Sequence, residues 1–333
     1  MPRQARLDVP GALHHVMGRG IERRAIFLRR EDQEDFLSRL EKLVEVKGFL
    51  IYAWALMPNH FHLLVRSTAT PLSHSMRSLM TGYAGYFNRT HHRTGHLFQN
   101  RFKSILCEED PYLLELVRYI HLNPLRAKIV GSLKDLEHSP LTGHAVLNGT
   151  MKRGWQNTKE VLSRFSKSEE KAIRKYRAFI AEGVGKPIPK NLEGGGLIRS
   201  MGGWSAVESL RKGREKYCSD ERILGDSDFV GKLLKEAERE AVEHKRLMVK
   251  WSLEQLIELT CHKMGVSVSS LSGGSKERSV VLAREGLSYL WVKKFKRSGG
   301  DLVRATGMKP ITIYQSARRG EKRASDWLAW LGE

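Results

Sequence analysis

Cysteine, long apolar runs and acidic residues are all scarce in this chain of 333 residues. The three cysteines, Cys107, Cys218 and Cys261, lie far apart, which excludes a disulfide framework and a zinc ribbon. The longest apolar run covers residues 49–57 and is too short to cross a bilayer. The first residues lack the apolar stretch of a secretion signal, so we expect a cytoplasmic protein with no membrane partner.

The shortage of acidic residues leaves a strongly basic chain. Lys and Arg number 57 against 37 Asp and Glu, a formal net charge of +20. This charge predicts a polyanionic partner, nucleic acid before membrane, and says nothing about the fold. The hydrophobic content of 41% is sufficient for a buried core and excludes general disorder.

Histidine and positive charge are distributed unequally along the chain. Residues 1–150 hold 11 of the 13 histidines, with 20 Lys and Arg against 14 Asp and Glu, a net charge of +6. The remaining residues carry +14, of which +9 falls in residues 276–323. We therefore expect a histidine-using front domain over 1–130, a helical and loop-rich connecting region over 131–250 and a helical DNA-binding domain over 251–333.

The first 130 residues alternate strand and helix patterns. Apolar spacing predicts strands over 12–18, 49–57, 60–65 and 96–107, and helices over 31–47, 72–83 and 111–123. The last helix should end near Asn123, because a residue before proline is pushed out of the helical region. This order predicts an α+β fold, a ferredoxin-like antiparallel sheet with helices.

The rest of the chain is predicted to be helical. Residues 160–182 and 227–248 have helical spacing, and the Gly- and Pro-rich stretch 183–203 is expected to be a linker. Residues 301–307, 308–310 and 311–319 predict a helix, a tight turn and a second helix, which is a helix-turn-helix. Side chains suited to base edges and phosphates on the second helix are those of Thr312, Gln315, Arg318 and Arg319.

The segment MPNHFHLLV at 57–65 is the first candidate for chemistry. In a strand, His60 and His62 point to one face and Phe61 to the other. Two imidazoles at this spacing can hold one divalent cation if oxygen ligands complete its shell. Taken alone, the pair is better explained as two half-exposed histidines of a strand without any ligand.

The segment RYIHLNP at 118–124 is the second candidate. On a helix Tyr119 and Asn123 share a face, beside an apolar stripe that includes Leu116 and Ile120. Tyr119 is then either an aromatic residue at the edge of the core or a nucleophile, and Asn123 can offer an amide oxygen to a cation. A phenol needs cationic surroundings or a metal to act as a nucleophile at neutral pH.

Three blocks of sequence resemble one family. AWALMPNHFHLLV (53–65), GHLFQNRFKSIL (95–106) and YLLELVRYIHLNPLRA (112–127), in this order, are similar to the REP-associated tyrosine transposases, which are HUH single-tyrosine transposases related to the IS200-like group. The resemblance covers about residues 1–130. It implies that His60 and His62 are the histidine pair, that Tyr119 is the catalytic tyrosine and that Asn123 is the third metal ligand.

The resemblance also implies a reaction. Mg²⁺ or Mn²⁺ would polarise a phosphate of hairpin-forming single-stranded DNA, and Tyr119 would form a 5′-phosphotyrosine and release a 3′-OH. The resemblance implies that Arg101 and Lys103 contact phosphate. The alternative is that both are ordinary charged residues exposed to solvent. His121 and His96 are expected to be surface or structural residues, and His91 and His92 to be solvated.

Residues 251–323 resemble the C-terminal DNA-binding domain of the replication initiator DnaA, through 283–291 and the helix-turn-helix. Lys309 and Pro310 stand where that family has its Asp-His pair, so its DNA sequence preference is not implied. This resemblance predicts duplex DNA as a second partner. An alternative to the enzyme is a sequence-specific regulator that binds repeats without cutting them, and the sequence leaves monomer and homodimer open.

Overall fold

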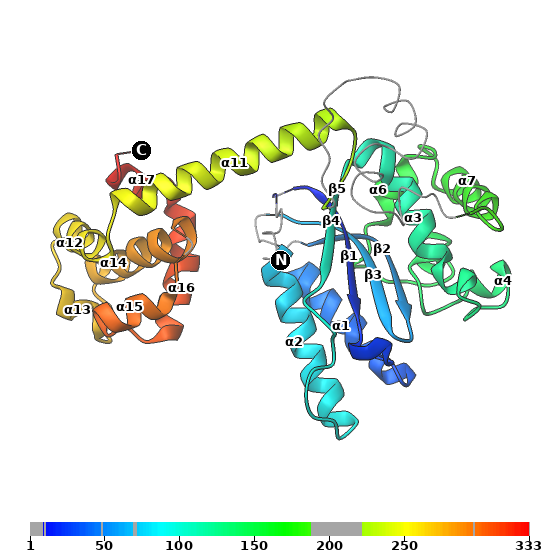
Figure 1. Cartoon of the computed structure of the whole chain (residues 1–333), viewed down its shortest axis with the longest axis horizontal. Coiled ribbons are helices and arrows are strands. Elements are labelled where there is room, and N and C mark those ends of the chain that lie inside the picture. The colour runs from blue at the N-terminus through cyan, green and yellow to red at the C-terminus, as the bar shows by residue number, and fades with distance from the viewer. Residues whose placement is uncertain are drawn as a thin grey trace. The chain divides into compact units, whose positions relative to one another are not determined.

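The computed structural model describes residues 9, 11–47, 49–68, 72–187, 222–295 and 297–332. The chain divides into two compact units, Met1–Leu234, here the front unit, and Lys235–Glu333, here the rear unit. The division falls within one helix, α11 (Ser227–Lys250). Figure 1 shows a sheet flanked by helices in the front unit and helices in the rear unit. None of the described helices is both long and apolar enough to cross a membrane.

The described strands of the front unit form one sheet in the order β2-β3-β1-β4-β5. The strands are β1 (Leu13–Arg19), β2 (Leu50–Met57), β3 (His60–Arg66), β4 (Lys103–Cys107) and β5 (Ile223–Leu224). The first four pair antiparallel, as predicted, but β5 runs parallel to β4 and makes the sheet mixed. The prediction of a wholly antiparallel sheet is thus wrong at one edge, because a strand of two residues leaves no periodic pattern in the sequence.

Helices cover both faces of this sheet. They are α1 (Arg30–Lys47), α2 (Leu72–Thr90), α3 (Glu109–Arg126), α4 (Leu133–Leu136), α5 (His144–Leu147), α6 (Thr158–Ser163) and α7 (Glu169–Glu182). On one face, Val16, Leu63 and Trp54 of the strands share a core with residues of α1 and α2. On the other, Leu13 and Leu64 share a core with α3 and the short helices that follow it. The two-residue period of each strand therefore assigns His60 and His62 to the α3 face.

Residues 131–182 are packed into the front unit. Four residues of this stretch are buried in the same core as α3, namely Leu136, Leu147, Val161 and Tyr176. This part of the predicted connecting region therefore packs as part of the sheet domain. Residues 188–203 of the expected linker lie outside the described residues.

Four predicted elements differ in extent. Helix α2 continues past the predicted end at residue 83 to Thr90, and the helix predicted over 160–182 is divided into α6 and α7. Helix α3 runs past Pro124 to Arg126, because this proline lies in the last turn, where the Ala127 amide still donates to the Asn123 carbonyl at 2.9 Å. The predicted strand over 96–107 is a strand only from Lys103. Residues 96–102 form an extended segment with a single bridge, between Phe98 and Gly20, because it leaves the sheet to lie between α2 and the end of β1.

The described part of the rear unit contains only helices. They are α12 (Leu253–Met264), α13 (Val268–Ser272), α14 (Arg278–Ser288), η2 (Tyr289–Lys294), α15 (Gly299–Thr306), α16 (Pro310–Gly320), η3 (Glu321–Arg323) and α17 (Ala324–Trp330). Their core is formed by Leu287, Trp291, Leu302, Ile313 and Trp327.

A helix, a turn and a second helix follow one another over 299–320, where the sequence predicts them. Gly307 adopts the left-handed conformation, with φ of 69°, and ends α15, since glycine takes this conformation without a Cβ penalty. Pro310 occupies the first turn of α16, where its missing N–H costs nothing. That this pair of helices reads DNA remains a prediction.

The beginning of α1 and the end of α2 meet at a buried carboxylate. Asp32 is fully buried and accepts hydrogen bonds from the amides of Leu28 (2.9 Å) and Arg29 (3.2 Å) and from Nε2 of His91 (2.8 Å). The expectation that His91 is merely solvated is therefore wrong, because the end of α2 returns to the start of α1.

Replacing Asp32 by alanine should lower the stability of the front unit by about 3 kcal/mol, since three donors lose their acceptor. The matched control is Glu31→Ala at the exposed neighbouring position, which should change stability by less than about 0.5 kcal/mol. Urea unfolding of both variants measures the difference. Equal midpoints for the two variants would contradict this role of Asp32.

Candidate active site

His60 and His62 lie on β3, directly after the turn at Pro58 and Asn59. Strand alternation places both on the α3 face, and their ring centroids are 5.1 Å apart. His62 is buried, and His60 is half-buried at the end of the strand. The structure thus brings the predicted pair together at the edge of the core.

A third histidine, His15, joins them from β1. Its Nε2 lies 3.0 Å from Nδ1 of His62, and the two rings stack with centroids 5.2 Å apart. Sequence reasoning missed His15 as a site residue. The signal was present, since His15 lies in the predicted strand 12–18, but only the pairing of β1 with β3 shows which histidine it meets.

Tyr119 reaches this pair from α3. Its ring is edge-on to both His15 and His62, with centroid distances of 5.8 Å in each case. Leu116 and Ile120 on the same helix are buried in the core, which leaves Tyr119 half-buried at its border. The residues singled out separately on a strand and on a helix are therefore neighbours in space.

Burial keeps the histidines neutral. It lowers the pKa of His60 to about 4, with a further contribution from the nearby Arg19. Burial also holds the pKa of His62 well below its usual value, assisted by His15, His60 and Arg19. A neutral imidazole keeps one nitrogen lone pair, which is the form that binds a metal.

The neighbouring Asn59 sets the tautomer of His60. Nδ2 of Asn59 donates to the Arg23 carbonyl (3.0 Å), so Oδ1 is the atom that faces Nδ1 of His60, at 2.6 Å. Because an amide oxygen only accepts, Nδ1 of His60 carries the proton and Nε2 keeps the lone pair. Asn59 therefore prepares His60 as a ligand through Nε2.

Asn123 lies one helical turn beyond Tyr119 and is half-buried. Its Nδ2 is buried and has no hydrogen-bond partner among the described residues. No group of three His, Cys, Asp or Glu suited to a metal occurs in the described ranges, so a metal here would rely on two imidazoles and the Asn123 amide. These neutral donors fit a divalent cation whose shell is completed by water or phosphate oxygens.

A cavity of about 330 Å³ opens beside the histidines. Its walls are Met17, Gly18, Arg19, His60, His62, Gln99, Asn100, Arg101 and Lys103. Arg101 and Lys103 are exposed, and no carboxylate is among these residues. A cavity with three cations and no acid suits a phosphate.

A series of hydrogen bonds between buried side chains fixes α3 in place. Nδ1 of His121 and Nδ1 of His144 lie 2.8 and 2.7 Å from the Tyr176 hydroxyl, and Asn148 Nδ2 donates to Nε2 of His144 (2.9 Å). His144 therefore donates to Tyr176, which donates to His121. His121 is fully buried and structural, and it holds the helix that carries Tyr119.

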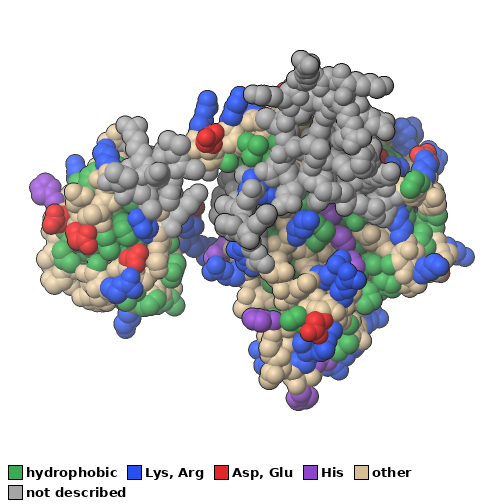
Figure 2. Space-filling view, viewed as in Figure 1, with side chains coloured by type: hydrophobic (Ala, Val, Ile, Leu, Met, Phe, Trp, Pro, Cys, Tyr) green, Lys and Arg blue, Asp and Glu red, His purple; other side chains and the backbone are tan. Residues whose placement is uncertain are grey.

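The predicted DNA-contact residues of the rear unit lie on α16. Gln315, Arg318 and Arg319 are exposed, whereas Thr312 is half-buried. Ile311 and Tyr314 are also exposed, at 65% and 56%, and sequence reasoning did not single them out. Figure 2 shows Lys and Arg side chains spread over this view of both units.

Comparisons with known proteins find a family similar to the first part of the front unit. Residues 9–123 match the family model described as Transposase IS200 like. Over these residues the chain is similar to the IS200-like transposases, in agreement with the resemblance found in the sequence. A solved structure of a REP-associated tyrosine transposase bound to a REP hairpin is similar at 19% identity, covering 47% of this chain and 90% of that chain, with a TM-score of 0.37. The search of curated proteins gave no match.

The lowered pKa of His144, about 4 because of burial and Arg177, predicts a pH dependence of stability. The unfolded histidine takes up a proton near pH 6.5 and the folded one only near pH 4, so stability falls as the pH drops between these values, by up to about 3 kcal/mol.

The test is the urea midpoint of the full chain from pH 7.5 to pH 4.5. In His144→Gln the midpoint should depend less steeply on pH, whereas in the exposed control His138→Gln the slope should match the original protein. Identical slopes for all three proteins would show that His144 is not responsible.

Proposed function

We propose that this protein is a metal-dependent tyrosine transposase that nicks and rejoins hairpin-forming single-stranded DNA. One observation carries the proposal: Tyr119 lies edge-on to the His15–His62 pair, and His62 in turn lines a cavity with three cations and no carboxylate. A nucleophile, neutral histidines and a cationic cavity that can accept a phosphate are parts that phosphoryl transfer uses.

The chain's residues have separate tasks in this reaction. The Tyr119 oxygen attacks the scissile phosphorus and loses its proton, a phosphotyrosine bond forms to the 5′ side, and the 3′ oxygen leaves and takes up a proton. Arg101 and Lys103 hold the phosphate and offset its charge. Since the energy of the broken bond is kept in the phosphotyrosine, attack by another 3′-OH rejoins the strand without an external energy source.

His60, His62 and Asn123 are the residues that would hold the cation, which when bound polarises the phosphate as a Lewis acid. Two imidazole donors suit Mn²⁺ better than Mg²⁺, which prefers an all-oxygen shell. His15 positions His62 by occupying its Nδ1, which leaves Nε2 of His62 for the cation.

The substrate follows from the resemblance of the three sequence blocks to REP-associated transposases. Members of that group act on palindromic repeats that fold into hairpins, and we extend this substrate class to the present chain. A regulator that binds such hairpins without cutting them is the alternative. It requires no nucleophile, so the presence of Tyr119 beside the histidines favours the enzyme.

Incubation with Mn²⁺ or Mg²⁺ and hairpin DNA taken from palindromes flanking the gene should give a covalent DNA–protein adduct that resists denaturation. Tyr119→Phe should abolish the adduct, because the nucleophilic oxygen is removed, and chelation of the metal should lower it at least about a hundredfold. The control Tyr86→Phe, on α2, should retain it. Adduct formation by Tyr119→Phe, or hairpin binding without any adduct, would favour the regulator.

We further propose that α16 of the rear unit binds duplex DNA. Exposed Gln315, Arg318 and Arg319 share this helix, which follows a turn of the kind found in helix-turn-helix proteins. Arginines offer phosphate contacts, and a glutamine amide can pair with adenine. The charge of +9 within 276–323 supports a polyanionic partner for this unit.

Arg318→Ala should weaken binding of the full chain to mixed-sequence duplex DNA. The slope of log affinity against log salt concentration should fall by about 1, because one phosphate contact is lost. Lys263→Ala, at an exposed position on α12, is the matched control and should leave the slope unchanged. Equal slopes in the two variants would count against α16 as the DNA-binding helix.

A further inference from the structure

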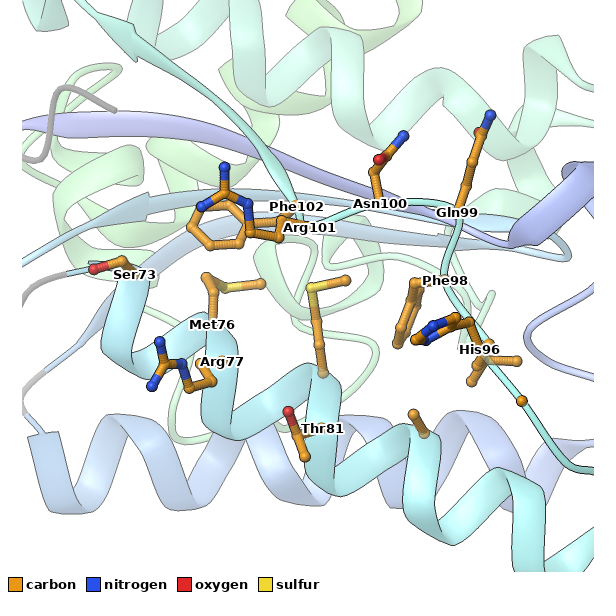
Figure 3. A pocket seen from close by; sticks show the side chains of 14 residues that line it. Ser73, Met76, Arg77, Thr81, His96, Phe98, Gln99, Asn100, Arg101 and Phe102 are labelled. Carbon is orange, nitrogen blue, oxygen red and sulfur yellow. The ribbon is translucent and has the colours of Figure 1, made fainter. Parts of the chain in front are cut away.

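A second, larger cavity of about 590 Å³ lies in the front unit between α2 and the extended segment 95–102. Figure 3 shows Met76 rising from α2 toward the segment that carries Arg101 and Phe102. The proposed reaction makes no use of this cavity. Its volume is in the range of sites that bind small organic groups.

The floor of the cavity is apolar and rigid. Met76, Met80 and Phe102 are buried, and Phe98 is half-buried among them. The Phe98 ring is held by perpendicular contact with Phe61, at a centroid distance of 6.2 Å. A fixed aromatic face next to polarizable methionines is a surface on which a planar ring can stack.

The rim of the cavity is polar and cationic. Arg77 and Thr81 from α2, and Gln99 and Arg101 from the segment, are exposed around the opening. Two arginines and no carboxylate are among the residues that line the cavity. A purely apolar ligand would not need this rim, and a small anion would not need the aromatic floor.

The segment 95–102 separates this cavity from the histidine cavity. Gln99, Asn100 and Arg101 line both. In Figure 3 the side chains of Gln99 and Asn100 point away from α2, while that of Met76 points toward the segment 95–102. The backbone N–H of Gln99 donates to the backbone carbonyl of Arg19 at 2.9 Å, and this hydrogen bond fixes the segment on the end of β1.

We propose that this cavity, here the α2 cavity, binds one unstacked base of single-stranded DNA next to the phosphate held at the histidines, and so selects the sequence that is cut. The base stacks on Phe98, and the rim arginines contact its flanking phosphates. The proposal rests on the proposed function for the position of the phosphate.

The test measures base selection by the full chain carrying Tyr119→Phe, so that no strand is cut. The probe is a DNA hairpin with a single-stranded tail of random sequence, and bound tails are sequenced. This parent should select one base at one tail position. Adding Thr81→Trp, which fills the opening from an exposed position, should abolish this selection and weaken binding about tenfold, the scale of one stacked base.

Two further variants separate the α2 cavity from general charge effects. Arg77→Ala should weaken tail binding several-fold, whereas Arg89→Ala, at an exposed arginine of the same helix outside the cavity, should stay within about twofold of the parent. With 2-aminopurine at the selected position, fluorescence should be quenched by the parent and by Arg89→Ala, and not by Thr81→Trp.

Unchanged base selection and affinity in both Thr81→Trp and Arg77→Ala would overturn the proposal, as would a parent that selects no base. Adduct formation through Tyr119 is measured separately in the otherwise unaltered chain. An adduct without any effect of the cavity variants rejects only the base site, whereas base selection without an adduct rejects only the cutting reaction.

Discussion

The antiparallel pairing of β1 with β3 is the constraint on which the site depends. It sets Met17 opposite His62 and Arg19 opposite His60, and it brings His15 within hydrogen-bond distance of His62. A shift by one residue would turn each side chain of β1 to the opposite face of the sheet, and His15 would then face α1 and α2. Since β1 also pairs with β4, the same register places Lys103 opposite Met17 and forms the cavity wall.

Burial and charge act together at this site. The histidines are taken out of water by α3 and by the strands, which favours their neutral form and lowers the pKa of His60 to about 4. Arg19, which borders the cavity, acts in the same direction, because a protonated imidazole beside it is unfavourable. An environment that repels a proton from the histidines is also one that attracts a phosphate.

Much of this site could be predicted because it depends on local periodicity. The period of two in a strand placed His60 and His62 together, and the helical spacing placed Tyr119 on a face with Asn123. The position of His15 next to His62 depends on the register between β1 and β3, which no local pattern in the sequence specifies. Likewise, Leu97 and Phe98 have the composition of a strand, and only tertiary packing shows that they leave the sheet to form the floor of a cavity.

The helices and strands of the fold could likewise be predicted where the signal is local in the sequence. Helices α1, α2 and α16 lie where apolar spacing and Gly or Pro residues predict them, since those signals act within a few residues. Strand β5 and the packing of α7 on α3 are contacts between segments far apart in sequence, and the sequence contains no short-range sign of them. The role of His121 belongs to this second group, because its partner Tyr176 comes from another helix and is itself held by His144 of a third.

If the two proposals hold, the position of the segment 95–102 would link strand cutting to base selection in physical terms. One wall of the histidine cavity and one wall of the α2 cavity are the same residues, and a backbone hydrogen bond to Arg19 holds them on the strand that carries His15. A base that enters one cavity therefore fixes the distance of its neighbouring phosphate from the other. Because a misplacement of about 1 Å is enough to slow a reaction strongly, a base that fits poorly would hold the phosphate away from Tyr119. Selection would then be exerted on the rate of cutting as well as on binding, with no moving part required.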